Sequence, residues 1–166
     1  QINYPVVQGE DNDLYLHKTF SANENTLGAI FVDAAASSDF TDKNTIIYGH
    51  RMKDGSMFRK LEEYKDKDFW KENPYFYIYT PDGKEITYKI YSVGQVLDTS
   101  DTYLTSFAGE EDYQKFLDMT MKEADYDTGV KVTTEDTVVT LSTCTAASDE
   151  HRFVVRGVKE KEVELQ

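Results

Sequence analysis

Three side chains suited to acyl-transfer chemistry occur at the ends of strand-like segments. Cys144, the only cysteine of the chain, closes an apolar, β-branched run that begins at Thr137. Arg152 opens the next apolar run, and His50 closes an earlier one that begins at Thr45. A thiolate attacks carbonyl carbons, an imidazole moves protons, and a guanidinium stabilises an oxyanion. These residue types predict nucleophilic catalysis through a covalent intermediate.

The alternative for the cysteine is a structural role, because a lone cysteine is more often a small buried hydrophobic residue than a nucleophile. Here Cys144 ends its strand, lies among small hydroxyl residues and precedes a polar loop at 146–150. A single cysteine also permits no internal disulfide. The context therefore favours a reactive thiol near solvent.

Other residues of the same types are weaker candidates. His17 lies at a strand end and is expected on the surface, and His151 directly precedes Arg152, so it points to the opposite face of a regular strand. Arg156 shares the face of Arg152 but lies about 13 Å along the strand. We therefore expect replacement of Arg156 by lysine to leave activity nearly unchanged.

Composition limits the class of protein. The 166 residues fit one domain spanning 1–166, and 12 tyrosines with 9 phenylalanines favour a sheet-rich fold. The net charge of −13 disfavours nucleic acids and anionic membrane surfaces as partners. No apolar run of about 18 residues is present, so no membrane span is expected within this chain. The acidic clusters lack the alternating spacing of a calcium loop, and we expect neither metal nor cofactor.

Periodicity and turn residues predict a mainly β domain. Helical spacing of apolar residues occurs at 57–71 and 110–124, and a Pro-Asp-Gly turn at 81–83 predicts a hairpin. We expect a closed or nearly closed β-barrel of about eight strands, with short helices and a helical insertion before the cysteine strand. The expected strands cover residues 4–8, 14–17, 28–33, 44–50, 75–80, 85–97, 137–144 and 152–157.

The motif residues resemble those of sortases, the cysteine transpeptidases of Gram-positive bacteria. The resemblance lies in the sequence Thr-Leu-Ser-Thr-Cys at 140–144, the following Arg152, and Tyr-Gly-His at 48–50. The opening NYPVVQG at 3–9 and the long insertion at 99–134 resemble the class B branch in particular. The resemblance covers essentially the whole chain.

The resemblance implies a role for each of the three residues. Cys144 matches the family nucleophile, His50 the general acid and base, and Arg152 the cation that stabilises the oxyanion. It implies cleavage after threonine in a C-terminal sorting motif of secreted proteins, either N-P-x-T-like or P-x-T-G-like. The acyl group then passes through a thioester to a peptidoglycan amine. The implied location is the extracellular face of the membrane, with an N-terminal anchor outside this chain.

Three residues are candidates for substrate binding. Ser142 shares a strand face with Cys144, although a hydroxyl that merely packs in the barrel wall is an equal alternative. Tyr103 aligns with a family position where an aromatic residue contacts the motif, and Thr145 directly follows the cysteine.

Two other functions compete with this interpretation. A papain-like cysteine hydrolase would place its cysteine at a helix N-terminus with the histidine later in the sequence. Here Cys144 ends a strand and His50 precedes it. A non-catalytic cell-surface binding module with an incidental cysteine is the rival from a different class. A trapped thioester would distinguish all three.

Overall fold

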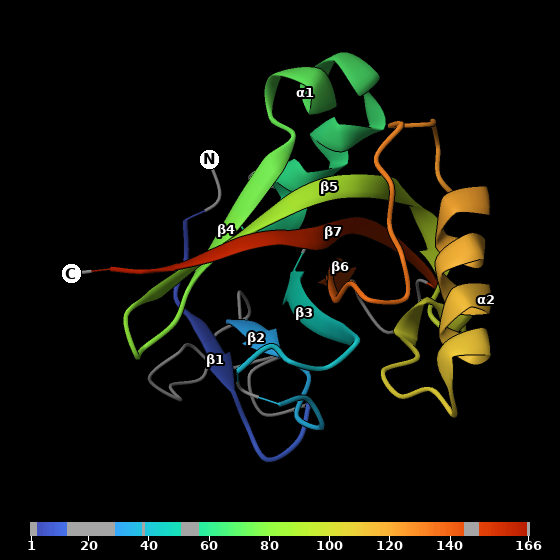
Figure 1. Cartoon of the computed structure of the whole chain (residues 1–166). Coiled ribbons are helices and arrows are strands. Elements are labelled where there is room, and N and C mark those ends of the chain that lie inside the picture. The colour runs from blue at the N-terminus through green and yellow to red at the C-terminus, as the bar shows by residue number, and fades with distance from the viewer. Residues whose placement is uncertain (1–2, 13–28, 38, 51–56, 145–149, 166) are drawn as a thin grey trace.

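The structure, a computed structural model, describes residues 3–12, 29–37, 39–50, 57–144 and 150–165. Its strands form one sheet in the order β1-β2-β3-β6-β7-β5-β4 (Figure 1). The predicted mainly β class is confirmed, while the strand expected at 14–17 lies outside the described residues. The strand bounds are Val6–Gln8 for β1, Ile30–Val32 for β2, Asn44–His50 for β3, Tyr75–Tyr79 for β4, Lys84–Leu97 for β5, Val138–Cys144 for β6 and His151–Glu164 for β7.

The expected barrel takes the form of a curled sheet with edge strands β1 and β4. Among the described residues it contains seven strands, against the eight or so that the sequence suggested. The two longest strands, β5 and β7, pair with register shifts at Thr87/Tyr88 and at Ile90/Ser92. Such bulges bend a strand and increase its twist, which allows the sheet to curl.

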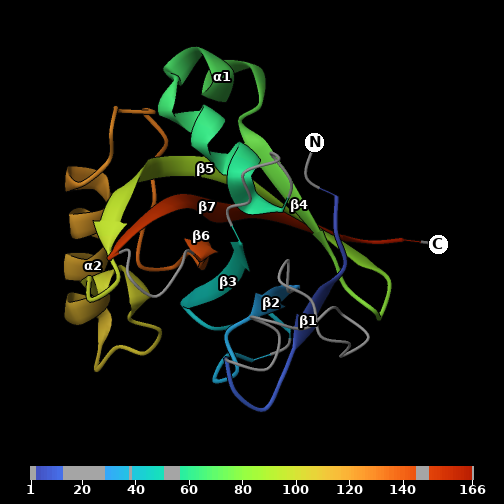
Figure 2. The same ribbon diagram turned by 180° about the vertical axis from the view of Figure 1, so that it is seen from behind.

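Helices lie where helical periodicity predicted them. The 57–71 region contains the 3-10 helix η1 at Phe58–Lys65 and the helix α1 at Lys67–Glu72. The insertion before the cysteine strand contains the 3-10 turn η2 at Asp101–Tyr103 and the helix α2 at Glu110–Lys122. Figures 1 and 2 show α1 and α2 at different flanks of the sheet. No helix in the described part of the chain is long and apolar enough to cross a membrane.

Each face of the central strands packs a separate core. Along β6, Val139 and Leu141 join the larger core, which η1 covers with Phe58 and Leu61. The residue before them, Val138, joins a second core beneath α2. This alternation follows from the period of two in a β-strand. The second core consists of Tyr91, Tyr113, Phe116, Leu117, Val138 and Val158.

A glycine next to the histidine lets η1 lie directly against β3. A Cβ atom added at Gly49 would lie 2.7 Å from two ring atoms of Phe58, closer than carbon atoms pack. The packing of η1 on β3 thus fixes the strand immediately before His50.

Candidate active site

The ends of three neighbouring strands meet at one end of the sheet. The parallel register of β3 and β6 pairs His50 with Cys144. The antiparallel register of β6 and β7 pairs Ser142 with Val154, and two further residues along it Cys144 is level with Arg152. Neighbouring strands lie about 4.8 Å apart, so the three backbone positions span about 10 Å. The fold therefore brings together the three positions that the sequence singled out.

A buried threonine hydroxyl links the end of β6 to the start of β7. The backbone N–H of Phe153 donates to Thr143 Oγ1 at 2.9 Å, and Thr143 is buried. This bond joins the residue before Cys144 to the residue after Arg152. Thr145 and the rest of 145–149 lie outside the described residues.

Arg152 is held beside the end of β5. Its side chain is 16% exposed, and Nη2 lies 3.9 Å from Oδ2 of Asp98, whose side chain is 45% exposed. Nη1 also donates to the carbonyl of His151 at 3.0 Å. Asp98 in turn donates its backbone N–H to the Glu150 carbonyl at 2.8 Å. Sequence reasoning missed Asp98, because only the β5–β7 register reveals that it lies beside Arg152.

Tyr103 contacts the sheet two residues before the ends of β3 and β6, beside Tyr48 and Ser142. Its hydroxyl oxygen is 2.7 Å from Ser142 Oγ. Its ring stacks on Tyr48 with 6.2 Å between centroids and 10° between planes. Tyr48 and Ser142 are register partners, two residues before His50 and Cys144. The two side chains expected to bind substrate therefore touch each other, about 7 Å along the strands from the His50–Cys144 pair.

Arg156 lies in the interior, away from the strand ends. Its side chain is completely buried, with Nη1 donating to Ser92 Oγ at 2.8 Å and Nη2 to Thr102 Oγ1 at 2.9 Å. A carboxylate oxygen of Glu123 lies 3.8 Å from Nη2. Burial lowers the pKa of Arg156, and Tyr91 and Glu123 oppose that shift. Arg156 is thus part of the protein interior, because its face of β7 is covered by η2 and α2.

His151 is exposed at the start of β7, and His17 lies outside the described residues. In the portions of the chain that the structure describes, no group of three or more His, Cys, Asp or Glu side chains could hold a metal ion.

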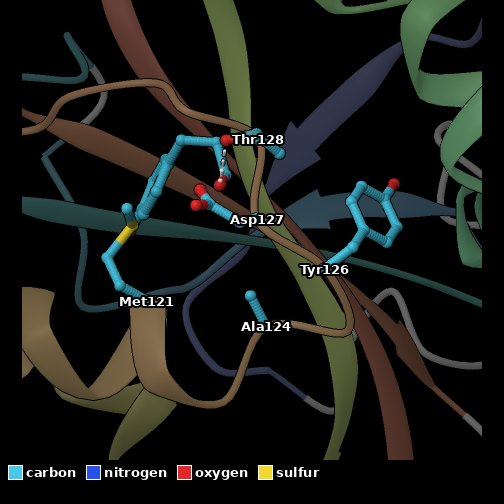
Figure 3. A pocket seen from close by; sticks show the side chains of 6 residues that line it. Met121, Ala124, Tyr126, Asp127 and Thr128 are labelled. Carbon is cyan, nitrogen blue, oxygen red and sulfur yellow. Dashed lines mark hydrogen bonds between the residues drawn. The ribbon is translucent and has the colours of Figure 1, made fainter.

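A separate depression of about 400 Å³ lies beside the end of α2 (Figure 3). Thr128 at its margin donates to the Tyr91 carbonyl at 2.8 Å. None of its lining residues carries a thiol, imidazole or guanidinium group, so it does not compete with the strand ends as a catalytic site. The lining residues are Tyr91, Met121, Ala124, Tyr126, Asp127 and Thr128.

The chain is similar to proteins of one known family. The sortase domain family model matches residues 1–160. Sortase B of Listeria monocytogenes serovar 1/2a is 39% identical over 161 residues, which cover 95% of this chain and 64% of that protein. Sortase B of Staphylococcus aureus is 35% identical over 150 residues, which cover 90% of this chain and 61% of that protein.

The fold agrees as well. A solved structure of a Staphylococcus aureus sortase B–substrate complex matches with a TM-score of 0.90 at 33% identity, covering 96% of this chain and 74% of that one. This chain spans less than two thirds of the length of the two sortase B sequences. On the family match over residues 1–160 and on its fold, the chain belongs to the sortase family, in the class B branch.

Proposed function

We propose that this chain is the catalytic domain of a cysteine transpeptidase. It would cleave a sorting motif of a secreted protein after threonine and transfer the acyl group to a cell-wall amine. The observation that carries the proposal is the register that pairs His50 with Cys144 and brings Arg152 to the same level on the next strand. Family membership supports the reaction class.

In the acylation step, the Cys144 thiol gives its proton to His50, and its sulfur attacks the threonine carbonyl carbon of the motif. The C–S bond forms as the carbonyl π electrons move to oxygen, and the resulting oxyanion accepts hydrogen bonds from Arg152. The oxyanion collapses, the amide C–N bond breaks, and His50 gives its proton to the leaving amine. A guanidinium suits this role because it stays charged at every working pH and its donors lie in one plane.

In the second step, an amine attacks the thioester carbonyl. His50 accepts the proton of the attacking amine, the C–S bond breaks, and the sulfur leaves as a thiolate that regains its proton from the imidazolium. Dividing one amide exchange into two acyl transfers lowers the barrier of each. A peptidoglycan amine is the acceptor that the sortase resemblance implies.

Tyr103 and Ser142 are the described candidates for holding the motif, with Thr145 as the third. Their hydroxyls are 2.7 Å apart, and the Tyr103 ring is half-buried on Tyr48. An aromatic face with a polar tip offers both apolar contact and a hydrogen bond to an extended peptide. The motif itself is N-P-x-T-like or P-x-T-G-like.

The setting follows from the family. Proteins of this kind act at the outer surface of Gram-positive bacteria, and we propose the same location for the protein that contains this chain. Its partners would be motif-bearing secreted proteins and the peptidoglycan amine. Two named relatives are sortase B proteins, which supports a class B choice of substrates. A papain-like mechanism is disfavoured because Cys144 ends β6.

The test is cleavage of fluorescence-quenched peptides of both motif classes, with and without an added amine. Cys144→Ala and His50→Ala should lose cleavage and transfer, and Arg152→Lys should lower kcat/KM at least about 10²-fold, comparable to loss of one oxyanion donor.

His151→Ala and His17→Ala are the matched controls, since both remove an imidazole outside the proposed triad. They should retain most of the activity. Turnover by Cys144→Ala above background would refute the nucleophile assignment. An inactive His151→Ala would show that we had assigned the acid and base to the wrong strand. A chain that neither cleaves nor transfers any motif peptide would favour the non-catalytic binding module.

A further inference from the structure

The short turn that carries Tyr103 is fastened to the sheet on both sides of that residue. The side-chain amide of Asn44 donates to the Thr102 carbonyl at 3.1 Å and to the Leu104 carbonyl at 2.8 Å. Its oxygen accepts a hydrogen bond from Thr140 Oγ1 at 2.8 Å. Asn44, Thr102 and Thr140 are fully buried.

Arg156 holds the same turn through a hydrogen bond to the Thr102 side chain. Its Nη2 donates to the Thr102 hydroxyl at 2.9 Å, and its Nη1 donates to Ser92 Oγ at 2.8 Å. Ser92 passes the connection to the helix α2, because its hydroxyl donates to the Thr120 carbonyl at 2.6 Å. Asn44, Thr102, Thr140 and Arg156 form what we call the buried anchor.

The buried anchor costs stability unless its polar groups are satisfied, since a charged group out of water is expensive. Fully buried strand positions are ordinarily occupied by apolar side chains. Here each of β3, β6 and β7 contributes one polar side chain, and all of them converge on Thr102 or on one another. The turn so fastened places the Tyr103 hydroxyl 2.7 Å from Ser142 Oγ.

We infer that the buried anchor is a positioning device: Asn44 and Arg156, acting through Thr102, fix Tyr103 in its place over Ser142 for binding of the sorting motif. This inference rests on the proposed function, in which Tyr103 contacts substrate. Arg156 and Asn44 are positioning residues. Arg156 is level with Thr140 and Asn44 with Val138, which are two and four residues before Ser142 on β6. Both therefore act on Tyr103 only through the turn.

Loosening the turn should weaken binding of the motif more than it slows the chemical steps. If loosening the turn leaves Tyr103 in its binding position for about a tenth of the time, the apparent affinity for the motif falls about tenfold. The transition-state groups at the strand ends are separate from the turn, so kcat and the reactivity of the Cys144 thiol should change by less than about twofold.

The test uses two matched substitutions at one position. Thr102→Val keeps the shape of threonine but removes the hydroxyl that accepts from Arg156, whereas Thr102→Ser keeps the hydroxyl. At a temperature where both variants are folded by circular dichroism, we expect Thr102→Val to raise KM about tenfold and Thr102→Ser to behave like the parent chain. Arg156→Met, which withdraws the same hydrogen bond from the other side, should reproduce the rise in KM.

A double-mutant cycle identifies the intermediary. If Thr102 acts through Tyr103, then adding Thr102→Val to Tyr103→Ala should change kcat/KM by less than about twofold, because the group that it positions is already gone. Effects of Thr102→Val and Tyr103→Ala that multiply would overturn the inference, as would a KM unchanged by Thr102→Val.

Hydrogen exchange separates this inference from the proposed function. The N–H groups of residues 102–104 donate to Ser100 and Asp101 within the turn. They should exchange faster in Thr102→Val than in Thr102→Ser, whether or not any peptide is cleaved. Unchanged exchange would overturn the buried anchor as a positioning device and leave the transpeptidase proposal intact. A Tyr103→Ala variant with unchanged KM would overturn the substrate contact, and the inference with it.

Discussion

Arg156→Lys should destabilise the protein more than Arg156→Met does, although lysine keeps the charge. The guanidinium reaches two hydroxyls in different elements, Ser92 of β5 and Thr102 of the insertion. A single ammonium nitrogen can reach only one of them, and it is the more strongly hydrated cation. Hydrogen bonds to charged groups contribute about 1.5–3 kcal/mol each. With the harder desolvation of the ammonium added, we expect Arg156→Lys to lower the free energy of unfolding by about 3 kcal/mol.

Arg156→Met removes the charge together with its desolvation penalty. Ser92 keeps its bond to the Thr120 carbonyl, and Glu123, whose side chain is 43% exposed, can be hydrated. Arg156 Nε also has no hydrogen-bond partner among the described residues, so its loss removes an unsatisfied donor. Replacing a buried ion by an apolar side chain of similar size is often nearly neutral. We therefore expect a loss of at most about 1 kcal/mol.

Urea denaturation and thermal melting by circular dichroism measure both variants. A domain of this size changes Tm by about 2–4 °C per kcal/mol, so Arg156→Lys should melt about 6–12 °C below the parent chain. A lysine variant within about 0.5 kcal/mol of the parent chain, or a methionine variant less stable than the lysine variant, would refute this reasoning about the buried guanidinium.

Three further perturbations have defined outcomes. Asp98→Asn removes the carboxylate beside Arg152; because this pair is partly exposed, kcat/KM should fall by at most about fivefold, and a loss above about 10²-fold would make Asp98 part of the catalytic machinery. Gly157→Ala should lower the free energy of unfolding by about 1–3 kcal/mol in urea melts, since the added Cβ would clash with the ring of Phe76. Full stability would contradict this packing. Iodoacetamide should alkylate Cys144 slowly at about pH 7 and faster toward about pH 9, because the residue ends a strand and no helix N-terminus among the described residues lies at its position to favour the thiolate. Rapid alkylation at about pH 5 would contradict this account.

The strand ends could be predicted from the sequence because they are local signals. An apolar run that stops at a polar side chain marks a boundary wherever its neighbours lie, and β3 and β6 end at His50 and Cys144 as predicted. Their pairing could not be read from the same pattern. Parallel strands so distant in the chain pair through the global topology, and only the resemblance to sortases suggested that they would meet.

Arg156 shows why the surroundings of the candidate site could not be predicted in full from the sequence. Alternation along β7 correctly assigned it to the face of Arg152, but the sequence did not say what covers that face. The insertion packs η2 and α2 over it, which buries the arginine. Asn44 and Thr102 likewise look unremarkable in sequence, because their partners come from other strands.

The single cysteine makes the central claim directly measurable. The chain is mixed with a motif peptide in the absence of any added amine, quenched at short times in acid, and analysed by intact mass and peptide mapping. We expect a covalent adduct that adds the mass of the motif fragment ending in threonine less one water, on the peptide that contains Cys144. We expect hydroxylamine to remove it. The adduct should be absent from Cys144→Ala. Peptide cleavage that proceeds without an adduct and survives in Cys144→Ala would contradict the account.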